Sequence, residues 1–335
     1  MVTSDRESSE GAEHLEIHPD PQRVGGIPSS LEAVPHRSAL FVSSCALNIG
    51  HTTMDSNTAS PDPVTDTPAD ERSAYEKAPD DGQEVDPRCI PQNLEEPPPV
   101  GDDIEYPDYD DDRHEIWGTL VERQLEQLPA RACNAYMRGL DVLDITPNRI
   151  PKLSALSRKL NDQTGWEVAR IPGLLHEKDF FTLLANRQFP STDYVRDWDE
   201  LDYTPAPDCF HDMFGHMPML TQPDFADFYQ LFGKAALNAE GADRPRLERF
   251  HWFTVEFGLL DEDGDTRIFG AGIVSSNEEV THALSDEVKK HRFDPAHITE
   301  KDYEVYNLQD ELFVMDSFEQ LVDGFRDWTK SRGLL

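Results

Sequence analysis

The feature that most constrains the fold is a change in sequence texture near residue 100. Before it, the chain is rich in Pro, Ser, Asp and Glu, as in SPDPVTDTPADE and NLEEPPPVGDD, and contains almost no aromatic residues. A segment of this composition cannot bury enough apolar surface to offset the entropy that it loses on ordering. We therefore expect residues 1–100 to be a disordered, acidic, Pro/Ser-rich extension and residues 101–335 to form a single folded domain.

From about Tyr106 onward, apolar residues recur at helical spacing. This periodicity predicts helices over residues 114–128, 129–143, 150–165, 178–189, 208–217, 225–239, 244–260, 277–290 and 315–330. Pro129 suits the first turn of the second helix. The pair Asp263-Gly264, followed by a short apolar run, predicts a small hairpin within residues 261–273. The fold class expected is mainly α with a small β component.

The charge balance is the second unusual feature. The chain has 30 basic and 66 acidic residues, which gives a formal net charge of −36. Such a field repels nucleic acid and anionic membrane surfaces, so neither is an expected partner. Acidic residues also run through the part expected to fold, for example Asp193 and Asp261. This distribution favours a halophilic adaptation of the whole protein over a local acidic tail.

Cysteine usage and the N-terminal residues bear on the compartment. The four cysteines lie far apart in the sequence, which fits a reducing compartment without a disulfide framework. The first ten residues are polar and lack the apolar core of a signal peptide. The apolar run at residues 39–50 is too short and too polar to span a bilayer. We expect a cytoplasmic protein.

Three residues form a candidate metal site: His211, His216 and Glu256. On a regular helix, a spacing of five places two side chains about 140° apart, because each residue advances by roughly 100°. Gly215 and Pro218 give the helix a reason to loosen, so that both histidines can face one point. Glu256 is a lone carboxylate in an aromatic run, and buried carboxylates are rare unless they are paired or bound to metal.

The residue types leave several interpretations open. The histidines could be unrelated, and Glu256 could pair with an arginine such as Arg267. Two imidazoles and a carboxylate leave three positions free on an octahedral ion, which is typical of non-haem Fe(II) oxygenases. The same ligands also serve zinc hydrolases with a bound water. A third class is an acidic binding or scaffold protein whose triad is vestigial.

Several sequence blocks, in order and with consistent spacing, resemble the pterin-dependent aromatic amino acid hydroxylases. They are IWGTL, PGLLHEKDFF, YTPAPDCFHDMFGHMPMLTQPDFADF, WFTVEFGLL, FGAGIVSS and YEVYNLQDELFVMDSF, and they cover about residues 106–325. The resemblance is closest to the short bacterial phenylalanine hydroxylases. It implies the catalytic-domain fold of that family over residues 101–335.

The resemblance also implies roles for individual residues. The iron ligands and catalytic residues would be His211, His216 and Glu256. The tetrahydropterin would be contacted by Gly173, Leu174, Leu175, Phe180, Asp212 and His251. The amino acid substrate would be contacted by Arg196 at its carboxylate, Thr204 and Ser275 at its polar end, Pro207 and Trp252 at its ring, and Tyr303.

Three positions depart from the family's usual pattern. Asp212 and Ala206 stand where the family usually has Glu, and a supporting ion pair at Ala206 is expected to be lost. His251 replaces a customary tyrosine beside the pterin. These departures bear on pterin affinity rather than on the chemistry.

The function implied is an Fe(II)- and tetrahydropterin-dependent monooxygenase that uses dioxygen to convert L-phenylalanine to L-tyrosine. The pterin would be tetrahydrobiopterin or a related compound. Tryptophan or tyrosine hydroxylation is the alternative within the family, because ring preference depends on pocket shape. The resemblance further implies a monomer, with pterin carbinolamine dehydratase and dihydropteridine reductase as pathway partners.

Overall fold

The computed structural model describes residues 86–303 and 307–335, so the disorder expected for residues 1–85 lies outside the described part of the chain. Residues 86–100 differ from that expectation. They contain a short 3-10 helix, η1 (Pro87–Cys89), and form β-bridges from Gln92 to Leu175 and from Val100 to Ala169. For this stretch the predicted disorder is wrong, because its backbone pairs with the domain and the Cys89 side chain is buried.

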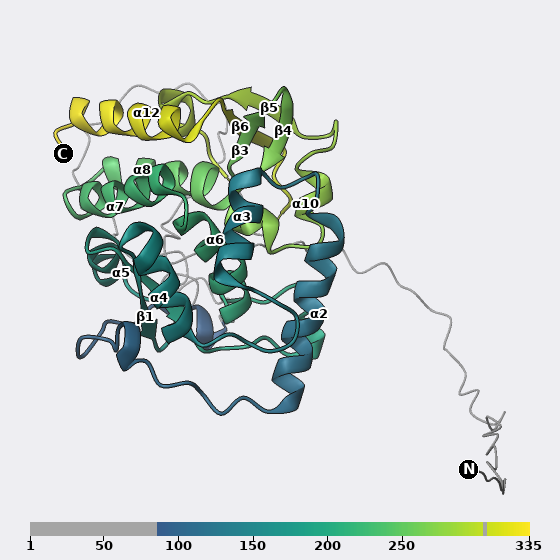
Figure 1. Cartoon of the computed structure of the whole chain (residues 1–335). Helices are drawn as coiled ribbons and strands as arrows, with labels where there is room; N and C mark the ends of the chain where they lie inside the picture. Colours follow the sequence, from purple (N-terminus) through teal and green to yellow (C-terminus); the bar gives the residue numbers. More distant parts are fainter. Residues whose placement is uncertain (1–85, 304–306) are drawn as a thin grey trace, which may run out of the picture. The chain divides into compact units, whose positions relative to one another are not determined.

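Helices dominate the described residues, which confirms the expected fold class (Figure 1). The longer ones are α2 (Asp111–Gln127), α3 (Asn134–Leu143), α4 (Leu153–Thr164), α5 (Glu177–Ala185), α7 (Pro223–Leu237), α8 (Asp243–His251) and α12 (Phe318–Ser331). The short ones are η2 (Gly101–Asp103), η3 (Trp198–Glu200), α6 (Met217–Leu220), α9 (Ala271–Val274), α10 (Glu279–His282) and α11 (Pro295–Ile298). The described residues also contain two π-helices, η4 (His211–His216) and η5 (Trp252–Glu256).

One helix begins later than its sequence suggests. Pro129 does not open α3; instead Ala130 has a positive φ of 65°, and the helix starts at Asn134. The thiol of Cys133 accepts a hydrogen bond from the backbone N–H of Tyr136 and caps the helix. The prediction failed because a proline at a possible first turn is also compatible with a turn.

The strands form two small sheets. Strand β1 (Glu167–Ile171) pairs in parallel with β2 (Gln188–Thr192). The second sheet has the order β4-β3-β6-β5. Its members are β3 (Leu259–Glu262), β4 (Asp265–Ile268), β5 (Lys289–Arg292) and β6 (Glu311–Met315). The β3–β4 pair is the expected antiparallel hairpin.

Three predicted helices are shorter than expected. The helix predicted over residues 244–260 ends with η5 at Glu256, and its last two residues belong to β3. The helix predicted over residues 178–189 ends at Ala185, and the chain then enters β2. The helix predicted over residues 277–290 is reduced to α10, and its end belongs to β5. All three errors arise where the chain enters a strand that pairs with another segment, and a local periodicity does not contain that information.

An aromatic core holds the helices together. In Figure 1, α7 lies between α5 and α12 and packs against both. The rings of Phe228, Phe232 and Phe250 each lie within 5.5 Å of the Phe325 ring, so α7, α8 and α12 share one cluster. Since α8 continues directly into η5, this cluster anchors the segment that carries Glu256. Among the described helices, none is both long and apolar enough to cross a membrane.

Candidate metal centre

Both segments that carry the candidate ligands are π-helical. In η4, His211 and His216 stand at the two ends, and the N–H of Met217 bonds to the carbonyl of Asp212, five residues back. In η5, the N–H of Phe257 donates to the carbonyl of Trp252 at 2.8 Å. A π-turn is wider than an α-turn and is common at functional sites. It brings residues five apart toward the same side, so the loosening expected at Gly215 and Pro218 takes this form.

The three candidate ligands converge on one point. The Nε2 atoms of His211 and His216 are 3.0 Å apart. The Glu256 carboxylate lies 3.7 Å from Nε2 of His211 and 3.4 Å from Nε2 of His216. All three side chains are buried, and neither carboxylate oxygen has a hydrogen-bond partner among the described residues. The alternative partner, Arg267, bonds to Asp265 and to the carbonyl of Ala130 instead.

The charge state of the cluster suits a divalent cation. Burial disfavours the imidazolium form and lowers the pKa of His211 to about 3. Burial would raise the pKa of Glu256, but the facing histidines, His216 above all, lower it to about 2. At neutral pH the cluster therefore presents a neutral imidazole at His211 and an anionic carboxylate without a hydrogen-bond donor. An unpaired buried anion is costly, so the residues fit a bound metal ion.

Ser275 controls the orientation of the first histidine. Its hydroxyl donates to the carbonyl of Ala271 at 2.7 Å, and its Oγ lies 2.9 Å from Nδ1 of His211. Because the hydroxyl proton is already donated to Ala271, Oγ accepts a hydrogen bond from the Nδ1–H of His211. The Nε2 atom of His211 is then unprotonated, with its lone pair directed toward the cluster. This arrangement is common behind metal-binding histidines. Ser275, expected at the substrate's polar end, therefore also contacts a candidate ligand.

His251 lies behind Glu256. Its Nδ1 is 3.8 Å from the Glu256 carboxylate, and its Nε2 is 3.1 Å from the hydroxyl of Tyr229. Burial lowers the pKa of His251 to about 4, so the ring is neutral at physiological pH. Its ring meets that of Phe180 edge to face, with 6.4 Å between the centroids. His251 thus links the candidate ligand to one of the residues expected to contact the pterin.

The other residues expected at the pterin share one hollow beside the metal cluster. It is lined by Gly173, Leu174, Leu175, Phe180 and Asp212, together with Ile171, Pro190, Thr192 and Pro207. Asp212 accepts a hydrogen bond from the backbone N–H of Thr192 at 2.9 Å, and burial raises its pKa to about 7. Pro207, expected at the substrate ring, lines this hollow as well. Phe180 and the Asp212 carboxyl group therefore line the same hollow.

The residues expected to hold the substrate lie close to the same cluster. Arg196 is buried and forms a bidentate ion pair with Asp208, with N–O distances of 2.8 and 2.9 Å. Asp208 also accepts a hydrogen bond from the backbone N–H of His211 at 3.0 Å. This carboxylate therefore joins the expected substrate arginine to the first metal ligand. Sequence analysis missed it, because a single Asp before a helix also fits a simple N-cap.

Trp252 and Tyr303, both expected to contact the substrate, pack against each other. Trp252 stacks on Tyr303 with 4.4 Å between the ring centroids, and its indole N–H donates to Gln309 at 3.1 Å. Thr204 is buried and donates to the carbonyl of Ala206 at 3.1 Å. Trp252 is the first residue of η5, so one π-helix supplies both a wall residue and the candidate ligand Glu256.

A second group of metal-ligand types, His291, His297 and Glu311, lies at the surface. There Glu311 already pairs with Lys301 at 3.0 Å and with Lys289 at 3.5 Å. Hydrogen bonds from Lys301 and His291 hold its pKa at about 2. The carboxylate is neutralised by lysine ammonium groups, so this group forms an ion-pair network rather than a second metal centre.

The comparisons with known proteins agree with this geometry. Residues 97–333 match the family of biopterin-dependent aromatic amino acid hydroxylases. The chain is 41% identical over 220 residues to a phenylalanine-4-hydroxylase of Pseudomonas aeruginosa, a match that covers 66% of this chain and 84% of the relative. It is 44% identical over 215 residues to that of Caulobacter vibrioides, covering 64% and 73% of the two chains.

Solved structures give the same result. The phenylalanine hydroxylase of Chromobacterium violaceum, crystallised with iron(III) and 7,8-dihydrobiopterin, is 36% identical, with a TM-score of 0.64 over 78% of this chain and 92% of that one. The family match spans most of the chain and contains all three converging ligands. This protein therefore belongs to the biopterin-dependent aromatic amino acid hydroxylases.

Proposed function

We propose that this protein is a phenylalanine 4-monooxygenase, which converts L-phenylalanine to L-tyrosine with dioxygen, Fe(II) and a tetrahydropterin. The observation that carries the proposal is the cluster of His211, His216 and Glu256, whose carboxylate oxygens are buried without a hydrogen-bond donor in the described chain. The relatives named phenylalanine-4-hydroxylase support the choice of substrate.

His211, His216 and Glu256 would hold the cation. Iron and tetrahydropterin, when bound, supply the activation of dioxygen. The neutral His211 imidazole and the anionic Glu256 need no proton transfer before they bind a divalent cation. Ser275 fixes the His211 ring, so the Nε2 lone pair stays directed at the cluster.

The pterin and the amino acid are positioned by separate groups of residues. Phe180 would stack on the pterin, Gly173, Leu174 and Leu175 would offer backbone contacts, and Asp212 and His251 would supply its polar surroundings. Arg196 pairs with the substrate carboxylate, because a guanidinium is suited to bidentate recognition of that group. Asp208 orients Arg196 for this task.

The ring of the substrate lies against an apolar wall. Trp252 and Pro207 face it, Tyr303 stacks behind Trp252, and Thr204 and Ser275 contact the polar end of the amino acid. These groups orient the ring and exclude water, which is the protein's share of a reaction whose hard chemistry belongs to its cofactors.

Turnover of three amino acids tests this proposal. Purified protein is loaded with Fe(II) and assayed with tetrahydrobiopterin and L-phenylalanine, L-tyrosine or L-tryptophan, in low and high salt. We expect L-tyrosine from L-phenylalanine, at a rate that requires both iron and pterin. Faster hydroxylation of tryptophan or tyrosine would reassign the substrate. A pterin-independent hydrolytic activity supported by zinc would contradict the monooxygenase.

We further infer that the enzyme works as a monomer in the cytoplasm. The three cysteines in the described part of the chain have free thiols, which fits a reducing compartment. A hydroxylase of this class releases an oxidised pterin, so it depends on pterin carbinolamine dehydratase and dihydropteridine reductase to regenerate the cofactor. A light-scattering mass of 38.0 kDa is expected for the monomer; twice that mass would contradict it.

A further inference from the structure

A segment that precedes the family match contacts both ligand-binding loops. We call residues Asp86–Leu94 the N-terminal strap. The match to the family begins at residue 97, so the strap lies outside it. One side of the strap reaches the substrate loop, defined here as residues 194–208. The other side reaches the pterin loop, defined here as residues 173–179.

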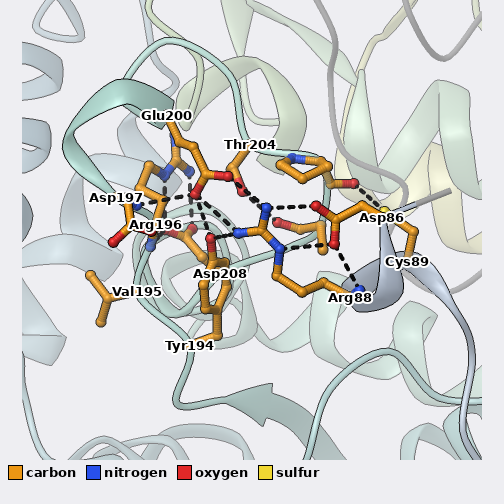
Figure 2. Close-up of polar contacts among 12 residues, drawn as sticks. Asp86, Arg88, Cys89, Tyr194, Val195, Arg196, Asp197, Glu200, Thr204 and Asp208 are labelled. Atoms are coloured by element: carbon orange, nitrogen blue, oxygen red, sulfur yellow. Dashed lines mark hydrogen bonds and ion pairs between the residues drawn. The ribbon is translucent and has the colours of Figure 1, made fainter. Parts of the chain in front are cut away.

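Arg88 makes the main contact of the strap with the substrate loop (Figure 2). Asp86 caps η1 and holds the Arg88 side chain through bonds of 2.7 and 3.0 Å. The far end of the guanidinium makes a bidentate contact with Glu200, at 2.6 and 3.0 Å, and also donates to the hydroxyl of Tyr194. The guanidinium carbon lies 4.9 Å from the Tyr194 ring centroid.

These contacts are transmitted to the residues expected to bind the substrate. Glu200 accepts a hydrogen bond from the backbone N–H of Asp197 at 3.1 Å, directly after Arg196. The thiol of Cys89 donates to the carbonyl of Pro205 at 2.8 Å, directly after Thr204. The strap therefore fixes the backbone beside both Arg196 and Thr204.

The electrostatics of Glu200 show that this contact is strong. Burial alone would raise the pKa of the Glu200 carboxyl, but hydrogen bonds from Arg88 and Tyr194 outweigh burial and lower it. The side chain of Glu200 is 18% exposed and that of Arg88 is 33% exposed, so solvent screens the pair only in part. A bidentate, partly buried arginine contact is more rigid than a typical surface ion pair.

The strap can position the substrate loop because its other end is anchored. The backbone of Gln92 bonds to both sides of the pterin loop, donating to Leu174 at 2.8 Å and accepting from His176 at 2.9 Å. The N–H of Leu94 donates to the Asp179 carboxylate at 2.8 Å. These are mainly backbone bonds, so they survive a change of the Arg88 side chain.

We propose that Arg88 is a positioning residue that holds the substrate loop, and with it Arg196, in the geometry that binds the amino acid. This inference rests on the proposed function, but its test compares variants with the parent for whichever aromatic amino acid the parent hydroxylates. The inference about Arg88 can therefore fail while the proposed function stands, and the proposed function can fail while the inference stands.

The test is a set of variants in the full-length chain. In Arg88→Met the KM for the amino acid is expected to rise by roughly tenfold, because the loop samples geometries that do not bind. The KM for tetrahydropterin and the iron content are expected to stay close to those of the parent, while the thermal midpoint falls slightly because Asp86 and Glu200 lose their partner. Arg88→Lys is expected to restore only part of the affinity, since an ammonium cannot hold Glu200 in a bidentate contact.

Three further variants make the result specific. Arg292→Met removes an exposed arginine at the end of β5, which pairs with Asp316, and should leave every constant unchanged. Glu200→Gln should raise the same KM, and the double variant should be no worse than Arg88→Met alone, because the two act as a unit. An unchanged KM in Arg88→Met would overturn the proposal. So would an equal rise in the KM for tetrahydropterin or a loss of iron, since that would show a general disturbance of the site.

Discussion

Glu279, a buried carboxyl group outside the metal centre, gives a residue-level test of the electrostatics. Its side chain is fully buried, and neither oxygen has a side-chain hydrogen-bond partner among the described residues. Burial raises its pKa from 4.5 to about 8. The unfolded chain ionises above pH 4.5 while the folded protein keeps the proton, so stability falls as pH rises from 4.5 to 8.

Replacement of Glu279 by Gln removes this ionisation. We expect the variant to gain stability over the parent as pH increases, with a small difference in thermal midpoint at pH 5 and a larger one at pH 8. The exposed Glu319, changed to Gln, is the control and should show no such trend. A Glu279→Gln difference that is the same at both pH values would show that the native carboxyl is not protonated.

At the residue scale, the sequence predicted the candidate metal ligands better than it predicted the residues that hold those ligands in place. His211, His216 and Glu256 stand out because their chemistry is unusual in an apolar context. Asp208 and Ser275 do not, since polar side chains that cap helices or bond to carbonyls are common. Their contacts with Arg196 and His211 depend on segments far apart in the chain, which residue type alone does not reveal.

At the element scale, a close approach of two helices positions the histidine segment. Gly139 on α3 faces α6, which directly follows η4. A Cβ atom at this position would lie 2.2 Å from the carbonyl oxygen of Pro218, a backbone atom that cannot rotate away. In an isolated helix, replacing Gly with Ala would stabilise by about 1 kcal/mol. Here the contact reverses that expectation.

We expect Gly139→Ala to destabilise the protein by about 2–3 kcal/mol, because α3 must move away from α6. The measurement is the free energy of unfolding in urea, together with iron retention. Gly165→Ala is the matched control: nothing lies within 4 Å of its Cβ, and only the left-handed φ of 73° opposes it. If Gly139→Ala proves no less stable than the parent, the close packing of α3 on α6 is wrong.

Most long helices could be predicted from their apolar spacing, and the π-helices and paired strands could not. The histidine spacing of five required a departure from regular α-geometry, and Gly215 with Pro218 indicated where it occurs. In the other segment, His251 and Glu256 are also five apart, yet the run RFHWFTVEFGLL contains no comparable breaker before Gly258. Strands β5 and β6 exist through pairing with each other, which is non-local.

At the scale of the whole molecule, the net charge of −36 predicts a strong dependence on salt. Self-repulsion destabilises a compact state of high charge, and dissolved ions screen it. We expect the thermal midpoint and the turnover rate to rise with NaCl up to molar concentrations. A thermal midpoint that is flat or falls over this range would contradict the halophilic interpretation.

The central claim is that His211, His216 and Glu256 together hold one iron ion. The most direct measurement is the iron stoichiometry of anaerobically loaded protein, compared between the parent and Glu256→Ala. The matched control is His297→Ala, from the surface ion-pair network. We predict about one iron per chain for the parent and the control, and almost none for Glu256→Ala with its circular dichroism retained. Full iron occupancy in a folded Glu256→Ala protein would contradict the account.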